Sequence, residues 1–401
     1  MGYRDIYKES NEQAEERFSL VMERIAEIAE ETDVPEKFDD YFKKTAAFLL
    51  QLKNVSEKAE KDTLKDASLT ECEKQNAGFY DDIKAENYGK SYGNPTYAVE
   101  KLGEEYGQIL SALYAECRKR ITDVYAAKKM NVTITAELFV EIYNYFEDKE
   151  GIDKTAIEQA IYWYFHDYSE IFIGDSVREL VDSEEDFLYQ IVMNSDLNDL
   201  RYLYQYGQHI GKNETGIAAF LNGMSDEEIQ AMADTYTEGY RIGFAATGKD
   251  LSKKTTAQVR YPIGFERMVR AAVKNLEKLN LKVTMRACSS AANKQYDYDH
   301  KEDKALYYDK AYVERRLEVM KTSFEEMKKL ANGQAGPAVI EVFGEIPFSP
   351  ETKKEVLKLD EKQQQLSVYD MSMSGQITNQ YIIGEERSFT IIAYPVPEIG
   401  E

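Results

Sequence analysis

The chain is short of basic residues. Its 401 residues include 50 lysines and arginines against 73 aspartates and glutamates, which gives a formal net charge of −23 and a sequence pI of about 4.8. Affinity for nucleic acid depends on clustered cations that displace counterions from phosphates. The composition therefore excludes a general nucleic-acid binder, and we expect no nucleic-acid partner.

Histidine and cysteine are also scarce, with three residues of each. Cys72, Cys117 and Cys288 are widely spaced and form no CxxC pair, so they indicate neither a disulfide framework nor a zinc knuckle. The first residues are charged and lack the apolar segment of a secretory signal. Together these features predict a protein of the reducing cytoplasm.

Long hydrophobic runs are missing as well. The longest, at residues 46–50 and 160–165, are far shorter than the roughly 20 residues that cross a bilayer, so we expect no membrane partner. Hydrophobic residues still make up 43% of the chain and aromatic residues 12%, which excludes a disordered acidic polypeptide. At roughly 100 to 200 residues per domain, the length predicts two or three folded domains.

Apolar positions have helical spacing through most of the first 250 residues. A polar stretch at residues 58–94 is interpreted as a loop, after which Asn94-Pro95 should open a helix that reaches about residue 128. The sequence Ser225-Asp-Glu-Glu228 is a capping box that should start another helix. Further amphipathic helical segments are expected near residues 136–147, 154–172, 184–194 and 197–207.

A polar break at residues 248–256 separates this region from one in which helices and strands alternate. That order predicts a mostly parallel sheet with right-handed crossovers. The predicted fold class is therefore α + α/β, with an all-α domain at residues 1–250 and an α/β domain at residues 257–401. Because no helix follows the last strand to cover it, we expect the chain to be truncated at its C-terminus. Strands are expected at residues 281–287, 338–343 and 389–396, and helices at residues 264–278, 304–331 and about 352–369.

One acidic stretch of the α/β region is the candidate site. Asp299 and His300 lie in the segment after a predicted parallel strand, and Glu345 follows the next strand. Ligands bind at the carboxyl ends of such strands, and carboxylates beside an imidazole can bind a divalent metal or share a proton. An acidic run can equally be a solvated loop before a helix. We take Asp299, His300 and Glu345 as substrate-binding candidates, and catalytic residues stay unassigned.

Familiar catalytic motifs do not occur. Gly89-Lys90-Ser91 resembles the end of a phosphate-binding loop, but Lys84 stands where that motif requires glycine. The chain also lacks the Gly-x-Gly-x-x-Gly, Gly-x-Ser-x-Gly and HExxH patterns. No motif therefore supports dinucleotide binding, a serine hydrolase or a zincin.

A family resemblance rests on the C-terminal segments 337–345, 377–382 and 385–401. They resemble the N-terminal domain of thermophilic-type metalloaminopeptidases, the leucyl aminopeptidases of the aminopeptidase T and aminopeptidase S kind, in a longer form found in anaerobic Gram-positive bacteria. The resemblance covers roughly residues 260–401, and the helical region would be an extension particular to that longer form.

The resemblance implies a cytoplasmic homodimer that removes N-terminal residues from peptide substrates. Two divalent ions, zinc, cobalt or manganese, would polarise the scissile carbonyl and supply a hydroxide nucleophile. The family's metal ligands lie in a C-terminal domain beyond residue 401, so none is assigned to a position here. We therefore expect this chain alone to hold no metal ion and to be inactive as a peptidase.

Two alternatives stay open. In the first, the chain is a non-enzymatic interaction protein whose acidic, tyrosine-rich helices bind a partner and whose α/β part is a scaffold. In the second, it is a self-contained enzyme that uses Asp299, His300 and Glu345.

Overall fold

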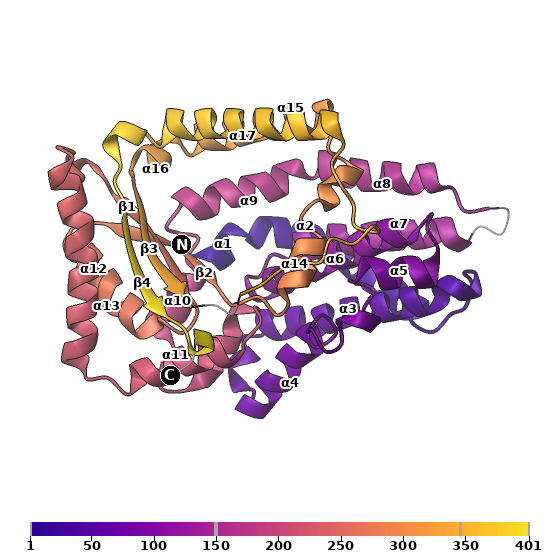
Figure 1. The fold of residues 1–401 in the computed structure, drawn as a ribbon, viewed down its shortest axis with the longest axis horizontal. Coiled ribbons are helices and arrows are strands. Elements are labelled where there is room, and N and C mark those ends of the chain that lie inside the picture. Colours follow the sequence, from indigo (N-terminus) through magenta and orange to yellow (C-terminus); the bar gives the residue numbers. More distant parts are fainter. Residues whose placement is uncertain (1, 148–150, 345–346, 400–401) are drawn as a thin grey trace.

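The structure is a computed structural model that describes residues 2–147, 151–344 and 347–399 (Figure 1). Helices make up the first part of the chain, and a four-stranded sheet, in which all paired strands are parallel, follows. The predicted α + α/β fold class is confirmed. Of the helices in the described ranges, none is long and apolar enough to cross a membrane.

Twelve α-helices form the part of the described chain that precedes the sheet. Short 3-10 helices connect some of them: η1 (Leu64–Asp66), η2 (Tyr88–Lys90), η3 (Leu200–Tyr206) and η4 (Leu251–Lys253). The α-helices are α1 (Tyr3–Ile6), α2 (Lys8–Ile28), α3 (Glu36–Glu60), α4 (Leu69–Tyr80), α5 (Pro95–Leu102), α6 (Gly107–Tyr125), α7 (Lys129–Glu147), α8 (Lys154–Asp167), α9 (Ser169–Val181), α10 (Phe187–Asn194), α11 (Lys212–Asn222) and α12 (Asp226–Ala246).

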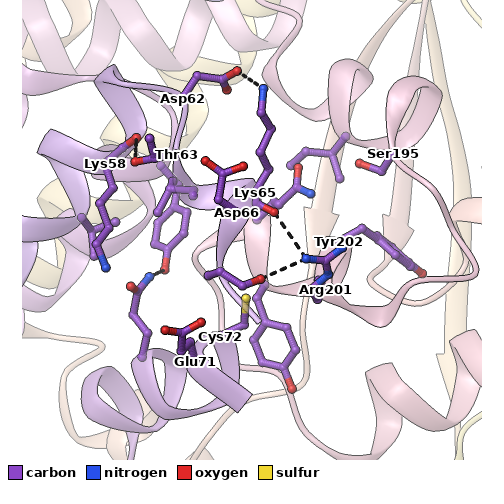
Figure 2. Close-up of a pocket in the computed structure, with 18 of the residues that line it drawn as sticks. Lys58, Asp62, Thr63, Lys65, Asp66, Glu71, Cys72, Ser195, Arg201 and Tyr202 are labelled. Atoms are coloured by element: carbon purple, nitrogen blue, oxygen red, sulfur yellow. Dashed lines mark hydrogen bonds and ion pairs between the residues drawn. The ribbon is translucent and has the colours of Figure 1, made fainter. Parts of the chain in front are cut away.

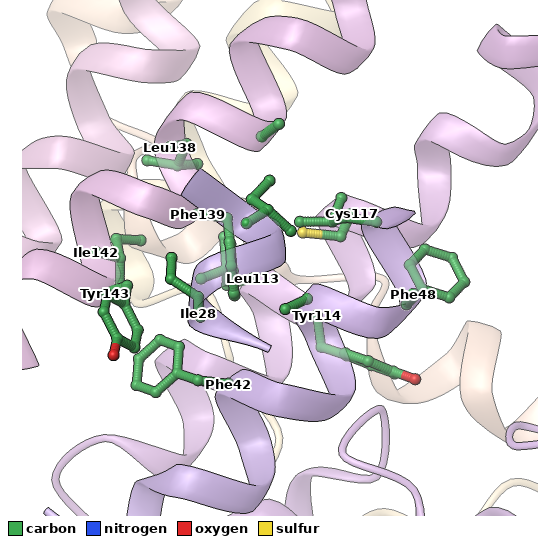
Figure 3. Packing of buried hydrophobic residues seen from close by; sticks show 14 of the residues in the cluster. Ile28, Phe42, Phe48, Leu113, Tyr114, Cys117, Leu138, Phe139, Ile142 and Tyr143 are labelled. Atoms are coloured by element: carbon green, nitrogen blue, oxygen red, sulfur yellow. The ribbon is translucent and has the colours of Figure 1, made fainter. Parts of the chain in front are cut away.

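The largest hydrophobic core joins α2, α3, α6, α7 and α8. Phe42 of α3 is at its centre, with the ring of Tyr143 edge-on at 5.0 Å and the ring of Phe146 at 5.1 Å between centroids. Figure 3 shows Phe42 beside Tyr143, with Leu113 and Phe139 close by. Edge-to-face aromatic pairs of this kind add to the free energy gained from burial. The apolar faces of these five helices thus meet in one core.

Two helix predictions in this part were wrong. The supposed loop at residues 58–94 contains α4, whose capping box has the Ser68 amide donating to Glu71 Oε2 at 2.7 Å and the Glu71 amide donating to Ser68 Oγ at 3.3 Å. The single helix expected to reach residue 128 is two helices, α5 and α6, because Gly103 interrupts it at φ +86°. In the first case, the capping box starts a helix although the surrounding segment is polar. In the second, a glycine at positive φ ends α5 before α6 begins.

The capping box at Ser225 is confirmed. The Ser225 amide donates to Glu228 Oε2 at 2.8 Å, the Glu228 amide donates to Ser225 Oγ at 3.2 Å, and α12 begins at the next residue, Asp226.

The sheet has the strand order β2-β1-β3-β4. One helix crosses from β1 to β2, three lie between β2 and β3, and one crosses from β3 to β4. All three predicted strands are present, but the prediction missed β1, which pairs with both β2 and β3. The elements are β1 (Thr256–Pro262), α13 (Glu266–Lys278), β2 (Lys282–Cys288), α14 (Lys294–Asp299), η5 (Asp303–Leu306), α15 (Lys310–Glu326), α16 (Lys328–Asn332), β3 (Gln334–Phe343), α17 (Glu361–Tyr381), η6 (Gly384–Glu386), β4 (Thr390–Pro395) and η7 (Pro397–Ile399).

β1 was missed because only one of its faces is apolar. Ala257, Val259 and Tyr261 are buried in the core that surrounds the sheet, while Gln258 and Arg260 alternate with them on the opposite face. A parallel strand that is buried on both faces would have been a continuous apolar run. The polar residues of β1 therefore mark a face of the sheet that is not fully covered.

The two faces of the sheet differ in their cover. Helices α10, α12 and α13 pack on one face and share its core. On the other face α9 reaches only the amino-terminal part of the strands, where Thr284 Oγ1 and Gln334 Nε2 both donate to the Leu180 carbonyl, at 3.2 and 2.7 Å. The crossover helices α15 and α17 lie side by side beyond the amino ends of the strands and form a separate core with α9 (Figure 1). The carboxyl half of this face stays open.

The core around the sheet also includes residues from α10, α11 and α12, which precede residue 250. The domain boundary expected between residues 250 and 257 therefore stays a prediction.

Gly336 of β3 should be sensitive to substitution. Its φ is +106°, and a Cβ atom there would lie 2.1 Å from the Ser388 carbonyl oxygen. We expect Gly336→Ala to lower the free energy of unfolding by about 2 to 4 kcal/mol, measured by urea denaturation. Gly375→Ala in α17, where a Cβ would meet no atom within 4 Å, is the control and should be neutral or slightly stabilising. Equal stability of the two variants would contradict this account.

Candidate anion-binding site

Asp299, a predicted site residue, is a structural anchor. It is fully buried at the end of α14 and accepts hydrogen bonds from Tyr88 Oη and Gln295 Nε2, both at 2.7 Å. Lys353 Nζ forms an ion pair with it at 2.5 Å and also donates to Asn94 Oδ1 at 3.0 Å. The carboxylate thus ties the α/β part to the loop between α4 and α5.

His300 lies beside this anchor, and both of its ring nitrogens have partners. Nδ1 lies 2.7 Å from Asp303 Oδ2, and Nε2 lies 2.6 Å from the Gly93 carbonyl oxygen. The structure therefore brings Asp299 and His300 together, at a contact between the helical and α/β parts of the chain. Glu345, the third candidate, lies outside the described residues.

One cavity, of about 1190 Å³, lies between α3 and α4 on one side and α10 and η3 on the other. Its wall mixes polar, aromatic and charged side chains. Lys65 pairs with Asp62 (Figure 2). Arg201 pairs with Asp199 and donates to the Ala67 carbonyl at 3.1 Å. Two of its cations are thus neutralised by the chain itself.

A second cavity, of about 750 Å³, opens on the uncovered carboxyl half of the sheet. Its floor consists of β1, β2, β3 and β4, and the segment after β2 forms one wall. The strand order reverses between β1 and β3, since β2 lies on one side of β1 and β3 on the other. In open parallel sheets, ligands bind at the carboxyl ends of the strands at such a reversal. Topology therefore singles out this cavity.

Two arginines lie next to each other on this floor. Arg260 of β1 and Arg286 of β2 are register partners, so their side chains leave the sheet from adjacent strands about 4.8 Å apart. Arg260 Nε donates to Gln258 Oε1 at 2.6 Å. Among the described residues, no carboxylate lies within ion-pairing distance of either guanidinium.

The two guanidinium groups repel each other. Burial lowers the pKa of the Arg260 guanidinium, and the positive charge of Arg286 lowers it further. Like charges directly opposite each other on neighbouring strands destabilise a sheet. An anion bound between the two guanidinium groups would remove this repulsion.

The wall of the cavity contains an unsatisfied polar group. Asn213, at the start of α11, is 5% exposed, and its Oδ1 has no hydrogen-bond partner in the described part of the chain. Next to it, Glu214 Oε1 accepts hydrogen bonds from the Ser290 amide at 2.6 Å and from Ser290 Oγ at 2.8 Å. This carboxylate is therefore occupied in holding the loop after β2 against α11.

A buried tyrosine cluster supports the floor from the opposite face. Glu266, the first residue of α13, is fully buried and accepts hydrogen bonds from Tyr202 Oη at 2.8 Å and from the Gly264 amide at 2.9 Å. The hydroxyl groups of Tyr206 and Tyr261 lie 3.0 Å apart beside it. Burial raises the pKa of Glu266 to about 7, although its hydrogen bonds favour the ionised form.

One group of carboxylates within the described ranges could hold a cation. Oxygen atoms of Glu31, Asp33 and Glu147 lie within 4.8 Å of one another. Arg24 pairs with Glu31 at 2.8 Å and with Glu147 at 3.0 Å, so the group already has a counter-charge. It contains no histidine, and it does not fit the two-metal centre that the family resemblance implies.

Sequence reasoning missed Arg260 and Arg286. Each is the fifth residue of a strand of seven, which would place them side by side once both strands were recognised as parallel neighbours. Since β1 was not recognised, this signal could not be used.

Comparison of the chain with models of protein families, with curated proteins and with solved structures finds no match.

Glu266 should make stability depend on pH. Its folded pKa of about 7 lies above its ordinary value of 4.5, so its contribution to stability is complete below about pH 4.5 and is lost as the pH rises through 7. Burial also raises the pKa of Glu185 to about 7. We expect the free energy of unfolding to fall between pH 5 and pH 7.5. Glu266→Gln should remove roughly half of that fall, and the part removed should be on the order of 3 kcal/mol.

Urea denaturation at several pH values measures this effect. Glu227→Gln, which changes an exposed carboxylate in the first turn of α12, should leave the pH profile unchanged. An identical profile for Glu266→Gln and the wild type would refute the assignment.

Proposed function

We propose that this chain binds an anionic small molecule in the cavity on the open face of its sheet. The observation that carries the proposal is the pair of register-matched arginines, Arg260 and Arg286, without a carboxylate partner among the described residues. In a chain with a net charge of −23, carboxylates are plentiful. Because none of these carboxylates neutralises the two arginines, an anionic ligand is the best explanation for the pair.

Guanidinium groups suit this role. Each presents a planar set of donors that matches two oxygens of a carboxylate or phosphate, and such charge-assisted bonds are about twice as strong as neutral ones. The site lies on strands, which hold the two side chains at a fixed spacing. The proposed role is ligand binding, which is nearest to the non-enzymatic alternative from the sequence.

Aminopeptidase activity is a second proposal, supported by the resemblance of residues 337–345, 377–382 and 385–401. In that case the cavity would form part of the substrate wall, and the anion would belong to a peptide. We expect the chain alone to show no turnover of a leucine anilide with cobalt, zinc or manganese. Robust turnover would contradict the proposal that the metal ligands lie outside this chain.

Cys288 allows a direct test of anion binding. It is exposed in the wall of the cavity, two residues after Arg286 on the same face of β2. Iodoacetate is a small carboxylate, and iodoacetamide is its neutral analogue. We expect the ratio of their rates at Cys288, followed by mass spectrometry, to fall about fivefold in Arg286→Gln, which corresponds to about 1 kcal/mol of charge attraction.

Arg241→Gln is the matched control. It removes the same charge from the exposed surface of α12 and should leave the ratio at Cys288 unchanged. Cys72, which is half-buried elsewhere, provides an internal reference in each sample. Inorganic phosphate should slow the reaction of Cys288 in the wild type. An unchanged ratio in Arg286→Gln would disprove the proposed site.

A further inference from the structure

The cavity floor also carries apolar side chains next to its two arginines. Strand register places four side chains in one row across the open face: Arg286 on β2, Arg260 on β1, Val339 on β3 and Ile391 on β4. All four line the cavity. Half of the row is cationic, and the other half consists of branched apolar side chains. At about 4.8 Å between strands, the row is about 14 Å long.

The apolar half is unusually open to solvent. Ile391 is 57% exposed, and Phe389, which also lines the cavity, is 64% exposed. Residues of this kind on a parallel sheet are normally covered by a helix. Here no helix within the described ranges packs on them, since α12 contacts β4 from the opposite face.

Carboxylates also line the cavity beside this apolar half. Glu341 follows Val339 by two residues on the same face of β3, and Glu398 lies in the segment after β4. Glu341 is exposed and has no ion-pair partner among the described residues. A second negative charge at the far end of a ligand would therefore be repelled.

We propose that the ligand is an amphipathic monocarboxylate, with its carboxylate on Arg260 and Arg286 and an apolar chain over Val339 and Ile391. This inference rests on the proposed anion-binding function and specifies its ligand. The same chemistry occurs in a free aliphatic acid and in the C-terminal residue of a peptide with an apolar side chain.

Calorimetric titration of the full chain with four probes tests the proposal. Acetate provides the head group alone, octanoate adds an aliphatic chain, and N-acetyl-leucine represents a peptide C-terminus. Suberate has the length of octanoate with a second carboxylate. Because each buried methylene raises affinity by about fourfold, octanoate or N-acetyl-leucine should bind at least about tenfold more tightly than acetate. The tighter of the two identifies the source, and suberate should bind at least about tenfold more weakly than octanoate.

Two variants locate the apolar half of the site. Ile391→Ser should weaken the tighter of octanoate and N-acetyl-leucine about fivefold and leave acetate unaffected, and it should fold normally because this side chain is mostly exposed. Ile242→Ser, at a 50% exposed position on α12 outside the cavity, should change nothing. Equal affinities for acetate, octanoate and N-acetyl-leucine would overturn the inference, as would equal binding of octanoate and suberate.

Failure of this inference is distinguishable from failure of the proposed function. If Arg286→Gln lowers the iodoacetate preference of Cys288 but an apolar chain adds no affinity, the anion site stands and the amphipathic ligand is refuted. If the iodoacetate preference is also independent of Arg286, both the anion site and the amphipathic ligand are refuted.

Discussion

The parallel sheet is buried only as far as helices reach it, and the position of α9 decides how much of its second face stays open. Because α9 ends at Val181 and contacts the amino-terminal parts of β1 and β2, the carboxyl halves of the strands have no helix above them. The polar residues of β1, the exposed side chains of β4 and the cavity itself all depend on this uneven cover. The crossover helices that would normally lie there pack on one another and on α9 instead.

Local signals in the sequence predicted much of the fold. Capping residues such as Ser225 and apolar runs such as residues 338–343 carry their information in a few adjacent positions, and the structure confirms the elements they indicate. β1 could not be recognised in this way, because Gln258 and Arg260 satisfy an environment that exists only after the sheet has formed. Because β1 pairs with both β2 and β3, the strand order could not be predicted without it.

The roles of the site residues depend on contacts between segments that are distant in sequence. The acidic stretch that includes Asp299 and His300 looked reactive because its groups are ionisable and close in sequence. In the fold, those groups bind partners from distant segments, such as Tyr88, Gly93 and Lys353, and hold the helical and α/β parts of the chain together. Arg260 and Arg286 are 26 positions apart and become neighbours only through strand register, which composition and spacing do not reveal.

The segment that follows β2 has an architectural consequence. Within a few residues it forms a wall of the cavity through Ser290, which is held by Glu214, and then reaches the helical part, where Asn293 donates to the Ile83 carbonyl at 2.7 Å. Such a connection would usually be regarded as a permissive place for a tag, an insertion or a circular-permutation break. Here an insertion or a cut would shift both the cavity wall and the contact with the helical part of the chain. Engineering of this protein should therefore avoid residues 289–300.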